Sequence, residues 1–442
     1  MDIRHERFSA ASRSGLRYGD AALRLEDVSL EDVAASVATP FYCYSSASIR
    51  SAYERLSQAL APVGASICFA VKANGNLSVL SLLAELGSGM DIVSGGELER
   101  TLAAGAPAAG IVFSGVGKKR GEIRDALKAG IHQINVESAA ELDAIADVAR
   151  ELGLRAPVAF RYNPDVDAGT HTKISTGRKD DKFGMSGEEI LDAYARAATL
   201  PELDVVGLAV HIGSQLLDLE PFRQAYTHLA NLVMTLRGRG LSVTRLDLGG
   251  GIGISYDGGP APDVEDYGAI VSATLGGIGC ALTVEPGRWL VGPAGVLVTE
   301  VLYLKEAGET PTVIVDAAMN DLMRPALYGS LHAALPVRQN EVCGDRPVRI
   351  AGPVCESSDI FGTYAGLPAL SAGDLLAFTC TGAYGASMAS TYNARALVPE
   401  VLVEGNRFRV IRRRQETAEL LVLEEPTQWQ IAGLAAEGRA VR

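Results

Sequence analysis

Four features that could carry chemistry each follow a short apolar segment of the chain. Lys72 ends the apolar run in "CFAVKANGN", His211 begins "HIGSQ", Gly249 to Gly251 follow the strand-like residues of "LDLGGGIG", and Glu285 begins "EPGR". A lysine enclosed by apolar walls should have a lowered pKa, and its neutral amine can form a Schiff base with a carbonyl compound. Consecutive glycines let backbone N–H groups approach an anion such as a phosphate.

Each feature has a simpler explanation when it is taken alone. Lys72 could be a strand-end lysine that reaches solvent, His211 a buried histidine, Glu285 a helix cap or ion-pair partner, and the glycines a tight turn. The glycine run matches neither the dinucleotide-binding fingerprint nor a P-loop. Together, however, the four features supply what pyridoxal phosphate needs: an amine for the aldehyde, a cradle for the phosphate, a flat ring to stack on the cofactor and a carboxylate for the ring nitrogen.

The segments that position these residues alternate between strand and helix patterns. Helical periodicity covers residues 47–60, 77–86, 95–104, 138–152 and 221–236, and the β-rich runs cover residues 67–71, 91–93, 111–113, 133–136, 158–162, 206–211, 245–248 and 282–285. Such alternation requires parallel strands, and eight units can close into a (β/α)8 barrel. A doubly wound open sheet is the alternative, but eight near-equal units favour closure. The strand ends of a barrel share one mouth, so Asp91, Asn135, Arg161 and Asn163 would join the four features there.

The pattern changes after Glu285 to β-rich segments without long helices. These segments cover residues 296–304, 312–316, 348–350, 375–378, 401–403 and 408–411, and the stretch "EPGRWLVGPAG" marks the boundary. We therefore expect a cofactor-binding barrel over residues 41–289 and a β-barrel or sandwich domain over residues 290–442. We expect the N-terminal segment, residues 1–40, to pack with the β domain.

Composition narrows the class of protein. The 442 residues carry a formal charge of −13, which argues against nucleic acid or an anionic membrane as a partner. The basic run at residues 118–120 is expected to be a solvated turn. The charged start, the lack of a long apolar stretch and six scattered cysteines predict a soluble, cytoplasmic protein, and no His/Cys cluster has metal-ligand spacing.

The ordered motifs identify a family resemblance over nearly the whole chain. In order, they are "FAVKANGN", "MDIVSGGELE", "NPDVDAGTHTKISTG", "DKFGM", "HIGSQ", "LDLGGGIG", "EPGR", "MNDLMRPALYGSLH", "GPVCESSDIFG" and "GAYGASMASTYN". With them the chain resembles the fold-type III pyridoxal-phosphate decarboxylases, whose barrel is like that of alanine racemase. Within that family, "RPALYG" and "CES" resemble the branch that converts meso-diaminopimelate to L-lysine and CO2, the last step of bacterial lysine biosynthesis.

The resemblance assigns roles around the cofactor. It implies that Lys72 binds the cofactor aldehyde, that His211 stacks on the ring, that Glu285 pairs with the ring nitrogen and that Asp91 is a second acidic group nearby. The residues that it implies for the phosphate are Ser214, Gly249, Gly250, Gly251, Gly287, Arg288 and Tyr384.

The resemblance also assigns substrate contacts and a partner. Arg324 and Tyr328 would meet the distal carboxylate, Glu356 the distal ammonium, and Arg288 and Tyr384 could also contact the substrate. Cys355 would return a proton to the substrate Cα. In the family the "CES" segment reaches into the barrel of the partner subunit, which implies a homodimer with shared active sites.

Competing functions are weaker on this sequence. Ornithine and lysine lack the distal carboxylate that Arg324 would bind, so a sister decarboxylase fits less well. An amino-acid racemase favours a less electron-withdrawing partner than Glu285 for the ring nitrogen, and a non-catalytic cofactor-binding protein would lack residues 290–442. A catalytically dead homologue acting as a regulator is disfavoured by the full set of site residues. Trp289 and the stretch at residues 394–399 depart from the family pattern and bear on substrate choice.

Overall fold

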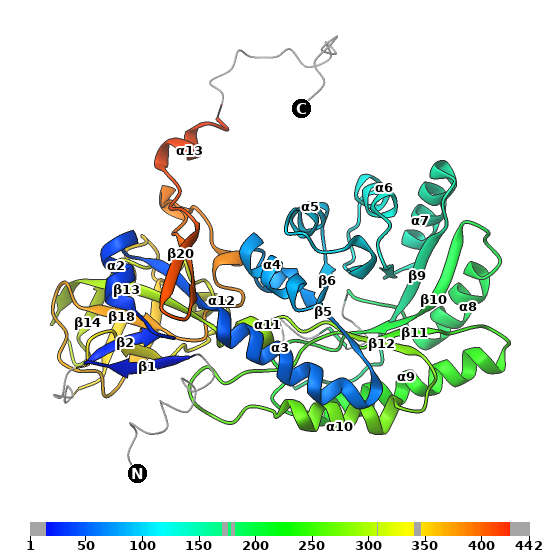
Figure 1. The fold of residues 1–442 in the computed structure, drawn as a ribbon, viewed down its shortest axis with the longest axis horizontal. Helices are drawn as coiled ribbons and strands as arrows, with labels where there is room; N and C mark the ends of the chain where they lie inside the picture. The colour runs from blue at the N-terminus through cyan, green and yellow to red at the C-terminus, as the bar shows by residue number, and fades with distance from the viewer. Residues whose placement is uncertain (1–14, 170–175, 178–181, 307, 340–345, 425–442) are drawn as a thin grey trace, which may run out of the picture.

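The computed structural model describes residues 15–169, 176–177, 182–306, 308–339 and 346–424. Residues 1–14 of the expected N-terminal segment, residues 170–175 of the motif "NPDVDAGTHTKISTG" and Cys343 lie outside the described residues. The described chain forms a barrel on one side and a β-rich domain on the other, with the short helix α13 (Thr417–Leu421) extending away from both (Figure 1).

Eight parallel strands close into the barrel, which confirms the expected (β/α)8 architecture. They are β5 (Ser66–Ala70), β6 (Gly89–Ile92), β7 (Ile111–Phe113), β8 (Gln133–Val136), β9 (Ala156–Tyr162), β10 (Leu203–Val210), β11 (Arg245–Asp247) and β12 (Ala281–Val284), and β12 pairs back to β5. Most of these strand residues are buried, as expected when a parallel sheet is covered by helices on its outer face.

The covering helices begin where short polar side chains cap them. Ser94, Ser138 and Ser186 accept a backbone N–H at the starts of α5, α7 and α8, which satisfies a donor that the helix itself leaves free. The main helices of the ring are α3 (Ser46–Leu60), α4 (Leu77–Glu85), α5 (Gly95–Ala103), α6 (Arg120–Ala129), α7 (Ala139–Leu152), α8 (Gly187–Ala197), α9 (Glu220–Gly238) and α10 (Val264–Leu275).

The second domain is built on a nine-stranded sheet that the N-terminal part of the chain completes. Strand β4 (Phe41–Ser45) pairs antiparallel with β13 (Gly295–Lys305) and parallel with β19 (Glu400–Glu404). The other strands of the sheet are β14 (Thr312–Val315), β15 (Ala334–Pro336), β16 (Val348–Ala351), β17 (Ile360–Tyr364), β18 (Leu375–Phe378) and β20 (Arg407–Arg412). A three-stranded sheet, β1 (Leu16–Gly19), β2 (Ala22–Leu25) and β3 (Val28–Ser29), and helix α2 (Leu30–Val37) pack on it through a separate apolar cluster that includes Leu25, Phe41 and Val298.

Hydrogen bonds join the β domain to the loop that follows β5. The backbone N–H of Tyr384 donates to the carbonyl of Ala73 at 2.8 Å, and Nδ2 of Asn74 donates to the carbonyl of Gly382 at 3.0 Å. Nδ2 of Asn76 donates to Oε1 of Glu400 at 2.9 Å. Both domains therefore fix the turn that carries Lys72.

The expected basic turn at residues 118–120 is wrong for its first residue. The Lys118 ammonium is fully buried and donates to Oε1 of Glu141 at 2.8 Å and to the carbonyls of Gly115 and Asn135 at 2.7 Å each. It ties the loop after β7 to α7 and β8, so a charge that looked solvated in the sequence is a structural link.

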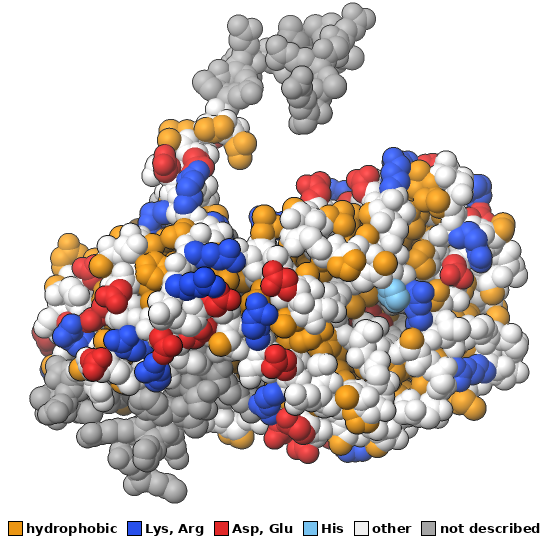
Figure 2. Space-filling view, viewed as in Figure 1, with side chains coloured by type: hydrophobic (Ala, Val, Ile, Leu, Met, Phe, Trp, Pro, Cys, Tyr) orange, Lys and Arg blue, Asp and Glu red, His pale blue; other side chains and the backbone are white. Residues whose placement is uncertain are grey.

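Surface charge and the length and polarity of the helices are relevant to which partners the protein can bind. Figure 2 shows acidic and basic side chains interspersed over one face of the molecule. Within the described residues, every helix is too short or too polar to serve as a transmembrane span.

Candidate active site

Lys72 lies at the barrel mouth, in the short 3-10 turn Val71–Ala73 that follows β5. Its Nζ lies 2.5 Å from Oδ2 of Asp91, a fully buried carboxylate on the neighbouring strand β6. Burial lowers the pKa of Lys72, but the carboxylates of Asp91 and Glu285 raise it and outweigh burial. The expectation of a lowered pKa is therefore wrong, because the carboxyl groups of Asp91 and Glu285 face the amine.

Glu285 is part of a buried polar network inside the barrel. Asp247, at the end of β11, forms a side-chain hydrogen bond with Glu285 and accepts hydrogen bonds from Nδ2 of Asn135 at 2.8 Å and from the backbone N–H of Gly249 at 3.0 Å. Oγ of Ser114 lies 3.3 Å from Oε1 of Glu285. The network links the carboxylate expected at the cofactor ring to the first glycine of the expected phosphate loop.

Glu285 and Asp247 are adjacent carboxyl groups, and burial raises the pKa of both. Burial raises the pKa of Glu285, the carboxylates of Asp247 and Asp91 raise it further, and Lys72 opposes them. Two adjacent carboxylates in a site this dry cannot both be ionised. The protonated form of Glu285 is therefore more favoured than that of an exposed glutamate.

His211 is held in its neutral form at the same mouth. Its Nδ1 accepts a hydrogen bond from the backbone N–H of Gly250 at 3.1 Å, which leaves the proton on Nε2. Burial and the nearby cations Arg161 and Lys72 lower the pKa of the imidazole. A neutral, fixed ring is suited to stacking on a flat cofactor.

The glycine run is a backbone cradle that side chains would fill. Gly249 and Gly251 have φ of +66° and +116°, values that side chains disfavour. A Cβ on Gly250 would lie 2.1 Å from the carbonyl oxygen of Glu285, and a Cβ on Gly251 would lie 2.4 Å from that of Gly213. The close approach of these backbones, rather than a simple turn, requires glycine here.

Two arginines are buried beside the cradle without a carboxylate partner. Arg288 donates to the Tyr256 hydroxyl and, at 3.0 Å, to Oγ of Ser214, while Arg324 donates to Oγ of Ser330 at 3.1 Å. Among the described residues, no carboxylate lies within ion-pair distance of either guanidinium, and both Nε atoms lack a hydrogen-bond partner. Buried cations without a carboxylate partner favour the binding of anions.

Most of the expected site residues line one cavity. It has a volume of about 220 Å³, and its lining includes Lys72, His211, Ser214, Gly251, Glu285, Gly287, Arg288, Trp289, Arg324, Tyr328 and Tyr384. A neighbouring cavity of about 420 Å³ shares Lys72, His211 and Glu285 and extends inward to Asn135 and Arg161. The structure thus brings together residues from the barrel and from the β domain that are far apart in the sequence.

Cys355 and Glu356 are not part of this cavity in the single chain. Both side chains are exposed, the backbone N–H of Cys355 donates to Oδ1 of Asn393 at 2.9 Å, and the Tyr392 hydroxyl donates to Oε2 of Glu356 at 3.0 Å. The structure therefore separates these two residues from Lys72.

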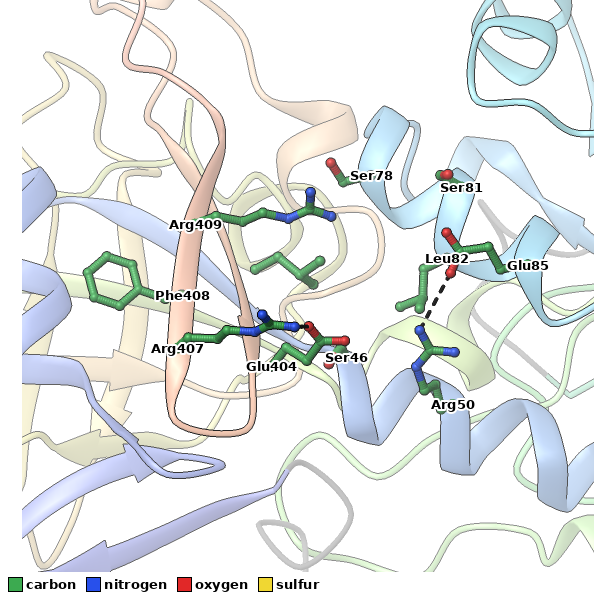
Figure 3. A pocket seen from close by; sticks show the side chains of 11 residues that line it. Ser46, Arg50, Ser78, Ser81, Leu82, Glu85, Glu404, Arg407, Phe408 and Arg409 are labelled. Carbon is green, nitrogen blue, oxygen red and sulfur yellow. Dashed lines mark hydrogen bonds and ion pairs between the residues drawn. The ribbon is translucent and has the colours of Figure 1, made fainter.

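A different cavity lies on the surface between α3, α4 and the β19–β20 hairpin (Figure 3). Two of its arginines are paired with acids, Arg50 with Glu85 at 3.6 Å and Arg407 with Glu404. None of the expected site residues lines it. The cavity at Lys72 is the candidate active site.

The residues at Lys72 fit pyridoxal phosphate. The glycine cradle and the unpaired Arg288 offer donors to a phosphate, and Ser214 lies beside them. Glu285, whose pKa is raised by burial, and the neutral His211 suit a ring nitrogen and a ring face. Oδ1 of Asp91 is a buried acceptor without a hydrogen-bond partner among the described atoms, so the site has an acceptor left for a ligand.

Sequence reasoning missed Asp247 and Tyr256. Asp247 is a carboxylate in an otherwise apolar strand segment, "LDL", and that was the available signal. Tyr256, five residues after the glycine run, carried no signal, because its role depends on the two arginines that the fold places against its ring.

Comparisons with known proteins agree on one family. Residues 46–292 match the pyridoxal-binding domain of the pyridoxal-dependent decarboxylases. The chain is 49% identical to the diaminopimelate decarboxylase of Pseudomonas aeruginosa, over 91% of this chain and 97% of that protein. It is 47% identical to the diaminopimelate decarboxylase of Neisseria meningitidis serogroup B, over 93% and 98%. The crystal structure of the Helicobacter pylori enzyme of that name, complexed with L-lysine, aligns with a TM-score of 0.85 and 43% identity, over 88% of this chain and 98% of that one.

Proposed function

The chain belongs to the pyridoxal-dependent decarboxylases, in the branch of the diaminopimelate decarboxylases, and we propose that it converts meso-2,6-diaminopimelate to L-lysine and CO2. Its cofactor is pyridoxal phosphate, and the enzyme is a carboxy-lyase. The observation that carries the choice of substrate is Arg324, a buried cation without a carboxylate partner in the described chain, on the wall of the cavity that contains Lys72.

Residues of both domains would hold the cofactor. Lys72 would bind its aldehyde, with His211 on the ring face, Glu285 at the ring nitrogen and Asp91 close by. The phosphate would lie among Ser214, Gly249, Gly250, Gly251, Gly287, Arg288 and Tyr384. When bound, pyridoxal phosphate supplies an aldehyde carbon for amines and an electron-accepting ring for the electron pair that remains when CO2 departs.

Side chains of the protein would accept and hold the protons that this chemistry requires. The Lys72 amine must lose a proton before it can act as a nucleophile, and the carboxylate of Asp91 lies 2.5 Å away to accept it. Burial and the neighbouring Asp247 raise the pKa of Glu285, which would favour a proton on its carboxyl group beside the ring nitrogen.

The β domain would bind the distal carboxylate of the substrate. A guanidinium fork matches a carboxylate, so Arg324, with Tyr328 beside it, would hold the distal carboxylate of diaminopimelate. Ornithine and lysine lack that group and would leave the buried cation unpaired. Arg288 and Tyr384 lie in contact, with Cζ of Arg288 4.6 Å from the ring centre, between the phosphate and substrate ends.

A homodimer would complete the site. Cys355 and Glu356 are exposed, and the exposed Tyr392 donates a hydrogen bond to Glu356. If this face docks on the barrel of a second copy, Cys355 could deliver a proton to the substrate Cα and Glu356 could meet the distal ammonium. The free thiols of Cys43, Cys68, Cys280, Cys355 and Cys380 fit a reducing compartment, so we place the protein in the cytoplasm.

The test is CO2 release by the purified protein with pyridoxal phosphate, measured separately with meso-diaminopimelate, L-lysine and L-ornithine. Release from diaminopimelate alone is the expected result. Release only from lysine or ornithine would overturn the substrate, and the absence of a visible absorbance band from bound cofactor would overturn the site.

A further inference from the structure

One tyrosine ring contacts both buried arginines of the candidate active site. Cζ of Arg324 lies 4.7 Å from the centre of the Tyr256 ring, and Cζ of Arg288 lies 5.8 Å from it. Arg288 also donates a hydrogen bond to the Tyr256 hydroxyl. Tyr256 is buried and does not line the cavity, so it contacts both cations from behind.

The position of this ring is itself fixed by the β domain. The ring of His332, which is fully buried, meets Tyr256 edge to face with centres 4.8 Å apart, and its Nδ1–H donates to the carbonyl of Thr379 at 2.9 Å. The backbone N–H of Ala333 donates to the carbonyl of Tyr256 at 3.2 Å. Tyr256 belongs to the loop after β11, so these contacts lock a barrel loop onto the domain that carries Arg324.

An aromatic partner suits arginines that must bind anions. The ring face attracts a guanidinium, but the ring has no net charge, so it orients the cation without neutralising it. An aspartate or glutamate in the same place would pair with the arginine and weaken its attraction for a substrate carboxylate.

We propose that Tyr256 is a positioning residue that sets the separation between the phosphate-end arginine, Arg288, and the distal-carboxylate arginine, Arg324, and so selects substrates that carry a second carboxylate at that separation. This inference rests on the proposed function, in which Arg324 binds the distal carboxylate. It adds to that function the residue that fixes the distance between Arg288 and Arg324.

The test compares ring-less and ring-retaining variants of the holoenzyme. Tyr256→Leu should raise the KM for diaminopimelate about tenfold while kcat changes by less than about threefold. Tyr256→Phe retains the ring and should restore the KM to within about threefold of the wild type. Its loss of the hydroxyl contact to Arg288 should appear as faster loss of pyridoxal phosphate on dialysis, followed by absorbance. Tyr303→Leu, the same change at an exposed tyrosine of β13, is the matched control.

Inhibition by L-lysine separates positioning from general damage. L-lysine has no distal carboxylate, so its inhibition constant should stay within about twofold in Tyr256→Leu if the variant acts through Arg324. An unchanged KM for diaminopimelate, or equal losses for diaminopimelate and L-lysine, would overturn the proposal. Tyr256→Met gives a second ring-less variant if the leucine variant does not fold. A wild-type protein that does not decarboxylate diaminopimelate would instead refute the proposed function.

Discussion

Oδ2 of Asp91 lies 2.5 Å from Nζ of Lys72, so the amine at the barrel mouth forms an ion pair with a carboxylate that is fully buried. The pair is formed by neighbouring strands, because Ala70 of β5 is in register with Asp91 of β6. Asp91 therefore both holds the amine in place and controls when it gives up its proton.

Replacing Asp91 by asparagine should shift the pH dependence of cofactor capture. Burial lowers the pKa of Lys72, and the Asp91 and Glu285 carboxylates raise it above its ordinary value. Removing one anion leaves more neutral amine at a given pH, so covalent capture of pyridoxal phosphate by apo Asp91→Asn should reach its full rate at lower pH than in the wild type. The measurement is the rate of appearance of the cofactor absorbance band against pH. Asp91→Glu, which keeps the charge, is the control, and identical wild-type and Asp91→Asn profiles would contradict the assignment.

Asp247 should make the stability of the apoprotein depend on pH. Burial raises the pKa of Glu285, the carboxylates of Asp247 and Asp91 raise it further, and Lys72 lowers it. Because the folded state holds a proton that the unfolded state releases above its ordinary pKa, the free energy of unfolding should fall as pH rises, by up to about 1.4 kcal/mol per pH unit. The buried thiol of Cys68 faces the same carboxylates.

Asp247→Asn should flatten that slope, because Glu285 then ionises at lower pH. Urea unfolding of the apoproteins between about pH 6 and pH 8 measures how the free energy of unfolding changes with pH. Asp218→Asn, which removes an exposed carboxylate, is the control and should keep the wild-type slope. Parallel slopes for the wild type and Asp247→Asn would show that the two carboxyl groups do not share a proton.

Gly250 should tolerate no side chain. A Cβ there would lie 2.1 Å from the carbonyl oxygen of Glu285, so Gly250→Ala must displace the backbone of one of the two strand ends. We expect a loss of about 3 kcal/mol or more in the free energy of unfolding and a failure to retain pyridoxal phosphate in gel filtration. Gly277→Ala is the control, since no atom lies within 4 Å of its added Cβ. Retention of cofactor by Gly250→Ala at wild-type stoichiometry would contradict the proposed phosphate cradle.

Mixing two inactive variants should restore activity if the site is shared. Lys72→Ala lacks the amine of its own barrel and Cys355→Ala lacks the thiol that we propose for the partner's barrel. A mixed dimer contains one site with both groups, so about a quarter of wild-type CO2 release should return after exchange of subunits. Neither variant mixed with itself should recover. No recovery, in a mixture that native mass spectrometry shows to contain mixed dimers, would place Cys355 in the site of its own chain.

The strand and helix alternation in the sequence was enough to predict the barrel and its mouth. β7 and β8 begin and end where expected, and the other barrel strands differ by one to three residues at an end. Lys72, His211 and Glu285 meet because carboxyl ends of parallel strands must meet. Three strands of the nine-stranded sheet, β4, β15 and β17, were not expected. Residues 41–45 were assigned to the barrel domain but form β4 between β13 and β19, while "ALP" and "IFGTY" are short and contain proline or glycine.

What the sequence could not predict depends on neighbours that only the fold supplies. The expected low pKa of Lys72 considered burial but not the two carboxylates that face the amine. Lys118 looked solvated because two of its three acceptors, on Asn135 and Glu141, come from later parts of the chain. Tyr256 has a role only through two arginines, one of them in the other domain.

The central claim is that Lys72 holds the cofactor at this barrel mouth. The most direct test is to make the attachment of the bound cofactor irreversible and to identify the residue that carries it. Reduction of the pyridoxal-phosphate-loaded protein with borohydride, followed by digestion and mass spectrometry, should place the phosphopyridoxyl group on Lys72 in the peptide that contains "CFAVKANGN". A label on another lysine such as Lys118, or no label on a protein that releases CO2 from diaminopimelate, would contradict the account.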